Sequence, residues 1–123
     1  MHHLTVAALL VAGVIHLLPV PGVLGANALA RLYGIEVSDP NTAILLQHRA
    51  LLFGILGVLM LAAIPFPSLR GVASWVGLAS AASFVVVALW VGGYDGAIRR
   101  VVVADVVAAV ALVAGLVAQR LAP

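Results

Sequence analysis

The residues that could do chemistry in this chain stand inside long apolar runs. His48 and Arg49 interrupt the run from Ala43 to Leu61, while His16 and Asp105 interrupt two other runs of the same kind. A charged side chain at the centre of a bilayer costs about 2.5–3.5 kcal/mol, and such residues face a partner or a functional site. A guanidinium also stays protonated in proteins. These four residues are therefore the first candidates for a site.

The composition places the chain in lipid. Of its 123 residues 65% are hydrophobic and 8% are charged, and the mean hydropathy is +1.27, whereas soluble domains carry about 25% charged residues. The chain has no Cys, which excludes disulfides and Cys-ligated metals. It shows no basic patch interleaved with aromatic residues, so nucleic acid is not an expected partner. We expect an integral protein of the bacterial inner membrane.

Four apolar segments divide the chain, at about residues 4–23, 41–64, 71–92 and 100–120. Each is near the ~20 residues that a transmembrane helix needs. The connections after the second and third segments are short, which favours antiparallel neighbours. The sequence predicts an all-α membrane protein, a single domain of residues 1–123 with four transmembrane helices in an up-down-up-down bundle. A short surface helix is expected between the first two spans, because residues 27–33 have an amphipathic pattern.

Counting along the predicted helices brings the polar residues to one half of the membrane. In a four-span bundle the first and third connections lie on the same side. At 1.5 Å per residue, His16 lies ~9 Å from that side, His48 and Arg49 ~12–13 Å, and Asp105 ~7–8 Å. The sequence thus predicts a polar pocket open toward one leaflet.

Three further residues belong to the same half of the membrane. Gln47 precedes His48, and the aromatic pair Trp90 and Tyr94 is expected near the mouth of the pocket. The central expectation is that Arg49 meets Asp105, either as a clasp that fixes helix register or as part of a ligand site. The predicted ligand-binding set is His16, Gln47, His48, Arg49, Trp90, Tyr94 and Asp105.

The two intramembrane histidines leave several interpretations open. Each could hydrogen-bond a neighbouring helix, handle protons or contact a ligand. With a carboxylate, His16 and His48 could also form a facial iron site, and the pair alone could ligate haem. The sequence does not decide among these.

Several short segments resemble a family of small bacterial four-helix membrane proteins of unassigned function, loosely similar to the DoxX-like group. They are AGVIHLLP at 12–19, LYGI at 32–35, DPN at 39–41, HRALLFG at 48–54, GGYDGAIRRVV at 92–102, and Asp105. Members often carry the label phosphopantetheine adenylyltransferase, a soluble α/β nucleotidyltransferase, and no segment of this chain could build that fold. DoxX-like relatives are associated with quinone or thiol redox metabolism, but this chain lacks Cys.

The leading functional hypothesis is a pocket that binds an amphipathic molecule of the quinone, lipid or isoprenoid class. Arg49 would hold an anionic or carbonyl head while the helices surround the tail. Whether a reaction follows is left open; if it does, His48 or His16 would act as acid and base, and Arg49 would stabilise developing charge.

Two other functions fit the same pattern. The length and four spans resemble small multidrug-resistance transporters, which carry an acid on the first helix where this chain has His16, so Asp105 would take that role in a proton-coupled transporter. Alternatively the chain is an accessory subunit of a larger membrane complex or a homo-oligomer, and the charges are a structural clasp.

Overall fold

The computed structural model describes residues 2–121, which are helical apart from short turns. The predicted all-α class is confirmed, and the described residues contain no strand. Residues 1, 122 and 123 of the predicted domain lie outside the described range. The elements are α1 (His2–Leu17), the 3-10 helix η1 (Val20–Leu24), α2 (Ala26–Tyr33), α3 (Pro40–Ala63), α4 (Pro67–Val91) and α5 (Gly96–Leu121).

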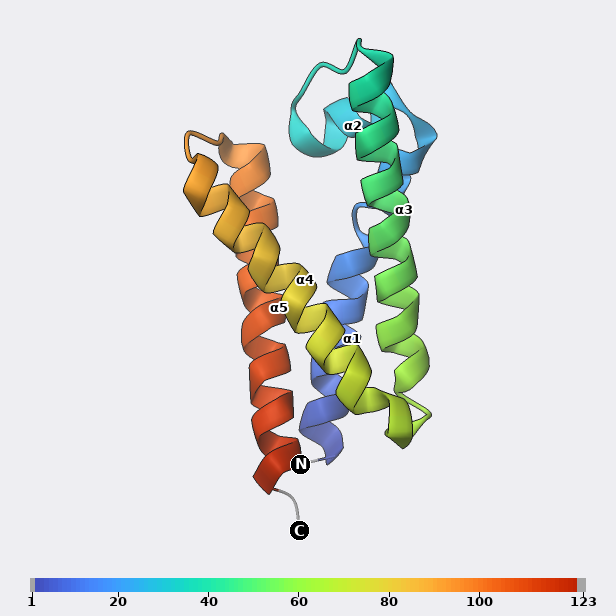
Figure 1. The fold of residues 1–123 in the computed structure, drawn as a ribbon, viewed down its shortest axis with the longest axis vertical. Helices are drawn as coiled ribbons and strands as arrows, with labels where there is room; N and C mark the ends of the chain where they lie inside the picture. The colour runs from blue at the N-terminus through green and yellow to red at the C-terminus, as the bar shows by residue number, and fades with distance from the viewer. Residues whose placement is uncertain (1, 122–123) are drawn as a thin grey trace.

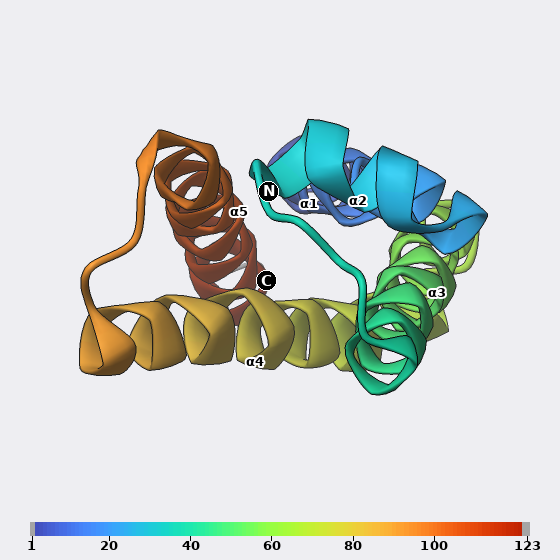
Figure 2. The same ribbon diagram turned by 90° about the horizontal axis from the view of Figure 1, so that it is seen from above.

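The long helices form the predicted up-down-up-down bundle, with α2 as the short helix between the first two spans (Figure 1). The segments His3–Leu24, Pro40–Ala63, Pro67–Val91 and Gly96–Leu121 are each long and apolar enough to cross a membrane. Helix α1 packs between α3 and α5, and α4 contacts both α3 and α5. Viewed from above, α2 lies across the end of α1, away from α4 (Figure 2).

Prolines set the bounds of the helices in the first and third spans. The predicted span of about 4–23 matches the candidate membrane segment His3–Leu24, in which α1 ends at Leu17 and the chain continues as η1. Pro19 and Pro21 lack the N–H that an α-helix would need there. Helix α4 begins at Pro67 instead of residue 71, since proline is well tolerated in the first turn, where its missing N–H has no helical partner.

The fourth span also begins earlier than predicted, at Gly96 instead of residue 100. The carboxylate of Asp95 accepts two backbone N–H groups of the first turn, at 3.1 and 3.3 Å, and so caps the helix. Asp105 is therefore nine residues into α5, about 13–14 Å at 1.5 Å per residue. This is the depth of Arg49 in α3, which also stands nine residues from the helix start.

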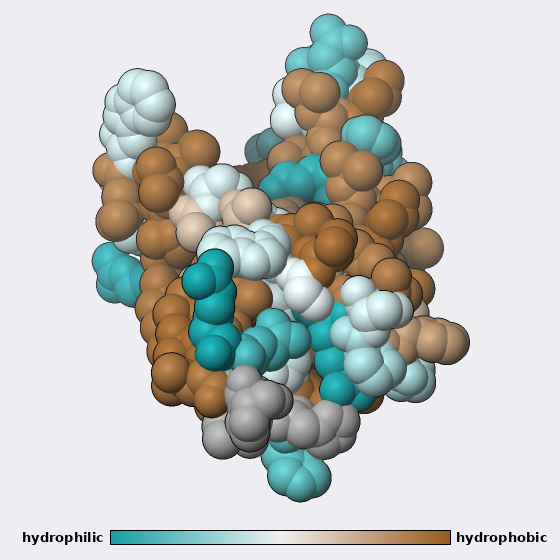
Figure 3. All heavy atoms as spheres, turned by 60° about the horizontal axis from the view of Figure 1, so that its bottom comes forward, coloured by the Kyte–Doolittle hydropathy of each residue, from teal (hydrophilic) through white to brown (hydrophobic). Residues whose placement is uncertain are grey.

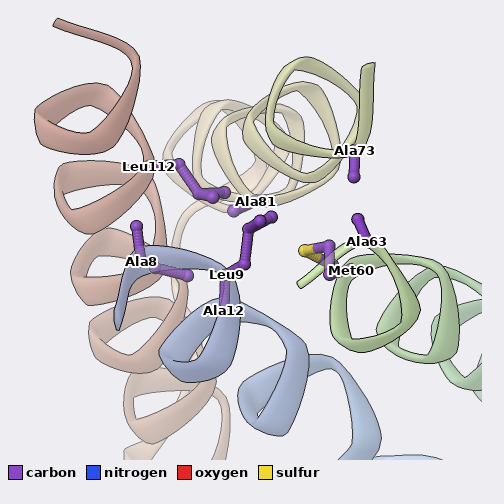
Figure 4. Close-up of a cluster of buried hydrophobic side chains, with 9 residues drawn as sticks. Ala8, Leu9, Ala12, Met60, Ala63, Ala73, Ala81 and Leu112 are labelled. Atoms are coloured by element: carbon purple, nitrogen blue, oxygen red, sulfur yellow. The ribbon is translucent and has the colours of Figure 1, made fainter. Parts of the chain in front are cut away.

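Small side chains make up most of the buried core, and the outer surface is apolar. The core cluster is drawn from all four long helices (Figure 4), and alanine is its commonest residue. Larger Leu, Val, Ile and Trp side chains point outward instead, so the flanks of the bundle in Figure 3 are largely hydrophobic, while polar residues gather toward its lower end. That distribution suits a bundle surrounded by lipid, where close packing of small residues drives helix association. The cluster consists of Ala8, Leu9, Ala12, Met60, Ala63, Ala73, Ala81, Ala108 and Leu112.

Helices α1 and α3 approach each other closely at two glycines, Gly13 and Gly57. A Cβ on Gly57 would lie 2.9 Å from the carbonyl oxygen of Gly13 and 2.9 Å from the Leu17 side chain. Real Cβ atoms essentially never come so close, and a backbone carbonyl cannot move aside as a flexible side chain can. The contact between the two helices therefore depends on glycine at position 57.

We predict that Gly57→Ala lowers the thermal stability of the protein in detergent, while Gly71→Ala does not. Overpacking of a close contact typically costs about 1–3 kcal/mol. Gly71 is the matched control because a Cβ there meets nothing within 4 Å, and alanine is the better helix former. Unfolding midpoints of the two variants measure the difference, and equal midpoints would contradict the proposed close contact.

Candidate ligand site at the open end of the bundle

A cavity of about 330 Å³ lies among α1, α2, α3 and α5, toward the end of the bundle that carries α2. At this end α4 and α5 separate from α2 and α3 (Figure 1), and the two pairs form distinct lobes in Figure 3. Ile15, Leu18, Leu32, Phe53 and Val101 are among the apolar residues of its wall. Its polar lining consists of His16, Arg31, Arg49, Arg100 and Asp105.

Arg49 is held mainly by aromatic side chains. Its Nη1 donates a hydrogen bond to the Tyr33 hydroxyl at 3.0 Å. The guanidinium carbon lies 4.4 Å from the ring centroid of Phe53 and 5.1 Å from that of Phe84. Arginine over an aromatic face is attracted by the ring quadrupole, by about 2 kcal/mol or more when desolvated. These contacts stabilise the charge without a carboxylate.

Asp105 lies in the same cavity without pairing directly with Arg49. Asp105 is only 5% exposed, and its carboxylate is close enough to Arg49 for a Coulomb attraction. Within the described residues, however, no hydrogen bond or ion pair within 4.0 Å connects the two side chains. The structure thus brings the predicted pair to one cavity and leaves the carboxylate facing its interior.

His16 is buried and uses both ring nitrogens inside the protein. It is 2% exposed, with Nδ1 2.8 Å from the Ala12 carbonyl oxygen and Nε2 2.9 Å from the Ser80 hydroxyl oxygen. A carbonyl can only accept, so Nδ1 carries the proton, and in the neutral ring Nε2 accepts from Ser80. The ring also contacts Phe53, with centroids 5.5 Å apart. The predicted hydrogen bond to a neighbouring helix is confirmed for this histidine.

The other four predicted site residues do not line the cavity. Gln47 instead donates to the carbonyl of Val23 at 2.9 Å and ties η1 to α3. His48 lies on the exposed face of α3. Trp90 is 87% exposed at the end of α4, and Tyr94 lies in the turn that follows.

The site also includes residues that were not predicted for it from the sequence pattern. Arg31 and Arg100, both exposed, lie where the aromatic pair was expected. Tyr33, the partner of Arg49, is buried on α2 together with Leu29. Their spacing of four residues was a usable signal, since it places them on one face of a helix. That face covers the cavity end of the bundle.

The haem and iron interpretations find no matching set of ligands. Over the described residues, no group of three or more His, Cys, Asp or Glu side chains comes close enough to hold a metal ion. Both nitrogens of His16 are engaged, and His48 lies outside the cavity. The donors present fit neither a two-histidine haem nor a facial iron site.

A second groove, of about 520 Å³, lies between α3 and α4 and shares residues with the cavity. Arg49 and Phe53 line both spaces. The rest of the groove is mainly apolar and includes Leu52, Leu56 and Val87. A molecule held at Arg49 therefore has apolar surface on two sides.

Comparisons with known proteins give no relative for this chain: no protein-family model, curated protein or solved structure matches it. The resemblance to small four-helix bacterial membrane proteins stays a prediction. The function has to be argued from the cavity and the helices that form it.

We predict that Tyr33→Phe destabilises the protein and that Tyr94→Phe does not. The first change removes the hydroxyl that accepts from Arg49, and hydrogen bonds to charged groups contribute about 1.5–3 kcal/mol. Tyr94 forms no hydrogen bond within the described residues, so it is a matched control. The readout is the midpoint of thermal unfolding in detergent. Equal midpoints would mean that the hydroxyl does not hold the guanidinium.

Proposed function

We propose that this chain is a small integral protein of the bacterial inner membrane that binds an amphipathic ligand in the cavity. One observation carries the proposal. His16, Arg49 and Asp105 come from three different membrane-length helices and line one cavity with apolar walls. A mainly apolar pocket with a few convergent polar groups is the usual form of a small-molecule site.

The state of the two charged residues supports binding over a purely structural clasp. A clasp would neutralise Arg49 with Asp105 directly, yet the guanidinium donates to Tyr33 and stacks on aromatic rings. A guanidinium has five N–H donors, and only one hydrogen bond from Arg49 is formed within the described residues. The remaining donors are suited to a polar ligand head at the cavity wall.

The proposal stops at binding and does not include a reaction. His16 donates to one backbone carbonyl and accepts from Ser80, so it would have to break a hydrogen bond before it could take a proton from a ligand. The ligand classes that fit are quinones, lipids and isoprenoids, each of which combines a polar head with an apolar tail. The resemblance to four-helix bacterial membrane proteins is compatible with this proposal.

We predict that the protein purified in mild detergent retains an amphiphile, and that Ala104→Trp loses it. Ala104 lines the cavity, so the larger side chain fills the space that a ligand would occupy. Ala79→Trp on the exposed face of α4 is the matched control. Mass spectrometry of the organic extract gives the occupancy, and circular dichroism shows whether each variant is folded.

Two results would overturn the proposed function. One is equal occupancy in the wild type, Ala104→Trp and Ala79→Trp, which would place any lipid on the outer surface. The other is an empty wild type that also binds no added quinone or lipid.

A further inference from the structure

The cavity contains more positive than negative charge. Three guanidiniums, from Arg31, Arg49 and Arg100, face one carboxylate, that of Asp105, which leaves a formal excess of two positive charges. The three arginines come from α2, α3 and α5, so the excess belongs to the fold and not to one run of sequence. A neutral ligand head would leave this excess uncompensated.

The other acidic residues do not supply the missing negative charge. Asp39 and Asp95 are used at helix starts, where their carboxylates accept backbone N–H groups of α3 and α5. Glu36 is exposed in the connection between α2 and α3. Across residues 2–121, no ion pair within 4.0 Å joins any of these acids to a cavity arginine.

Guanidinium groups favour a particular kind of anion. The planar fork of arginine forms paired, charge-assisted hydrogen bonds with phosphate and carboxylate oxygens. A quinone carbonyl accepts hydrogen bonds but brings no charge, so it would leave the excess positive charge of the cavity unpaired. Arg31 and Arg100 are exposed at the cavity, where they can attract an anion toward Arg49.

The groove between α3 and α4 gives such a ligand a place for its tail. Because Arg49 and Phe53 line both the cavity and the groove, a head at Arg49 adjoins the apolar surface of Leu52, Leu56 and Val87. This surface lies on the side of the bundle formed by α3 and α4, which faces lipid in a membrane.

We infer that the ligand is an anionic amphiphile with a phosphate head, held by Arg31, Arg49 and Arg100, with its hydrocarbon tail in the groove between α3 and α4. The inference rests on the proposed function and narrows its ligand class. Free inorganic phosphate shares the chemistry of the head but cannot use the groove.

The test measures binding of four probes to the purified protein by native mass spectrometry and by thermal shift. They are dioctanoyl phosphatidic acid, dioctanoylglycerol with the same tails and no phosphate, inorganic phosphate, and a short-chain quinone. We expect phosphatidic acid to bind at least tenfold more tightly than each of the other three. Arg49→Gln should remove this preference, while Arg99→Gln should keep it, because Arg99 neighbours Arg100 but does not line the cavity.

Two further variants test the charge and the tail separately. Asp105→Asn removes the carboxylate that lines the cavity and should tighten phosphatidic acid binding severalfold. Val87→Trp narrows the groove and should weaken binding at least fivefold, whereas Val86→Trp, on the exposed neighbouring residue, should not. Circular dichroism and unfolding midpoints confirm that each variant is folded before its affinity is compared.

Each contrary outcome has a distinct meaning. Equal binding of dioctanoylglycerol or quinone and phosphatidic acid overturns the anionic head but keeps the proposed function. Equal binding of inorganic phosphate overturns the lipid source. A preference kept in Arg49→Gln, or lost equally in Arg99→Gln, assigns the effect to general surface charge and overturns the site. No binding of any probe overturns the proposed function itself.

Discussion

The contact of the Arg49 guanidinium with aromatic rings is the interaction on which the rest of this structure depends. A permanent charge nine residues inside a membrane-length helix needs compensation. Tyr33, Phe53 and Phe84 provide it from α2, α3 and α4. The same contacts connect α2 and α4 to α3. One charged side chain thus connects the short helix, two of the membrane-length helices and the candidate site.

The small-residue core explains why the site lies at one end. Where alanines and glycines of two helices meet, as at Gly13 and Gly57, the helices touch almost backbone to backbone. Toward the α2 end, α4 leans away from α3 and stays with α5 (Figure 1). Larger side chains and arginines occupy the space that results. Small residues pack the helices tightly in the core, and larger residues on the same helices accompany the cavity at the α2 end.

The number of helices and the depth of each polar residue along its helix could be predicted from the sequence. The direction in which each side chain points around the helix axis could not. Apolar length alone gives the four spans, and counting residues places Arg49 and Asp105 at similar depth. Depth says nothing about rotation around the helix axis. His48 and Arg49 are adjacent and point about 100° apart, so Arg49 faces the cavity while His48 is exposed. Trp90 lies outside the cavity for another reason: it is on α4, and no residue of α4 lines the cavity.

The prediction that Arg49 pairs with Asp105 considers only opposite charges and leaves out the aromatic partners of arginine. Opposite charges at comparable depth predict an ion pair only if a carboxylate is the sole kind of partner for a guanidinium. Aromatic rings carry no formal charge, yet the Arg49 guanidinium lies against the rings of Phe53 and Phe84 and not against a carboxylate. The carboxylate then faces a cavity that carries two more arginines. An excess of cations beside an acid with no direct ion pair is an arrangement that adds little to stability, because Arg31 and Arg100 are exposed and solvated. It is a reasonable one for a site that is completed by an anion entering from outside.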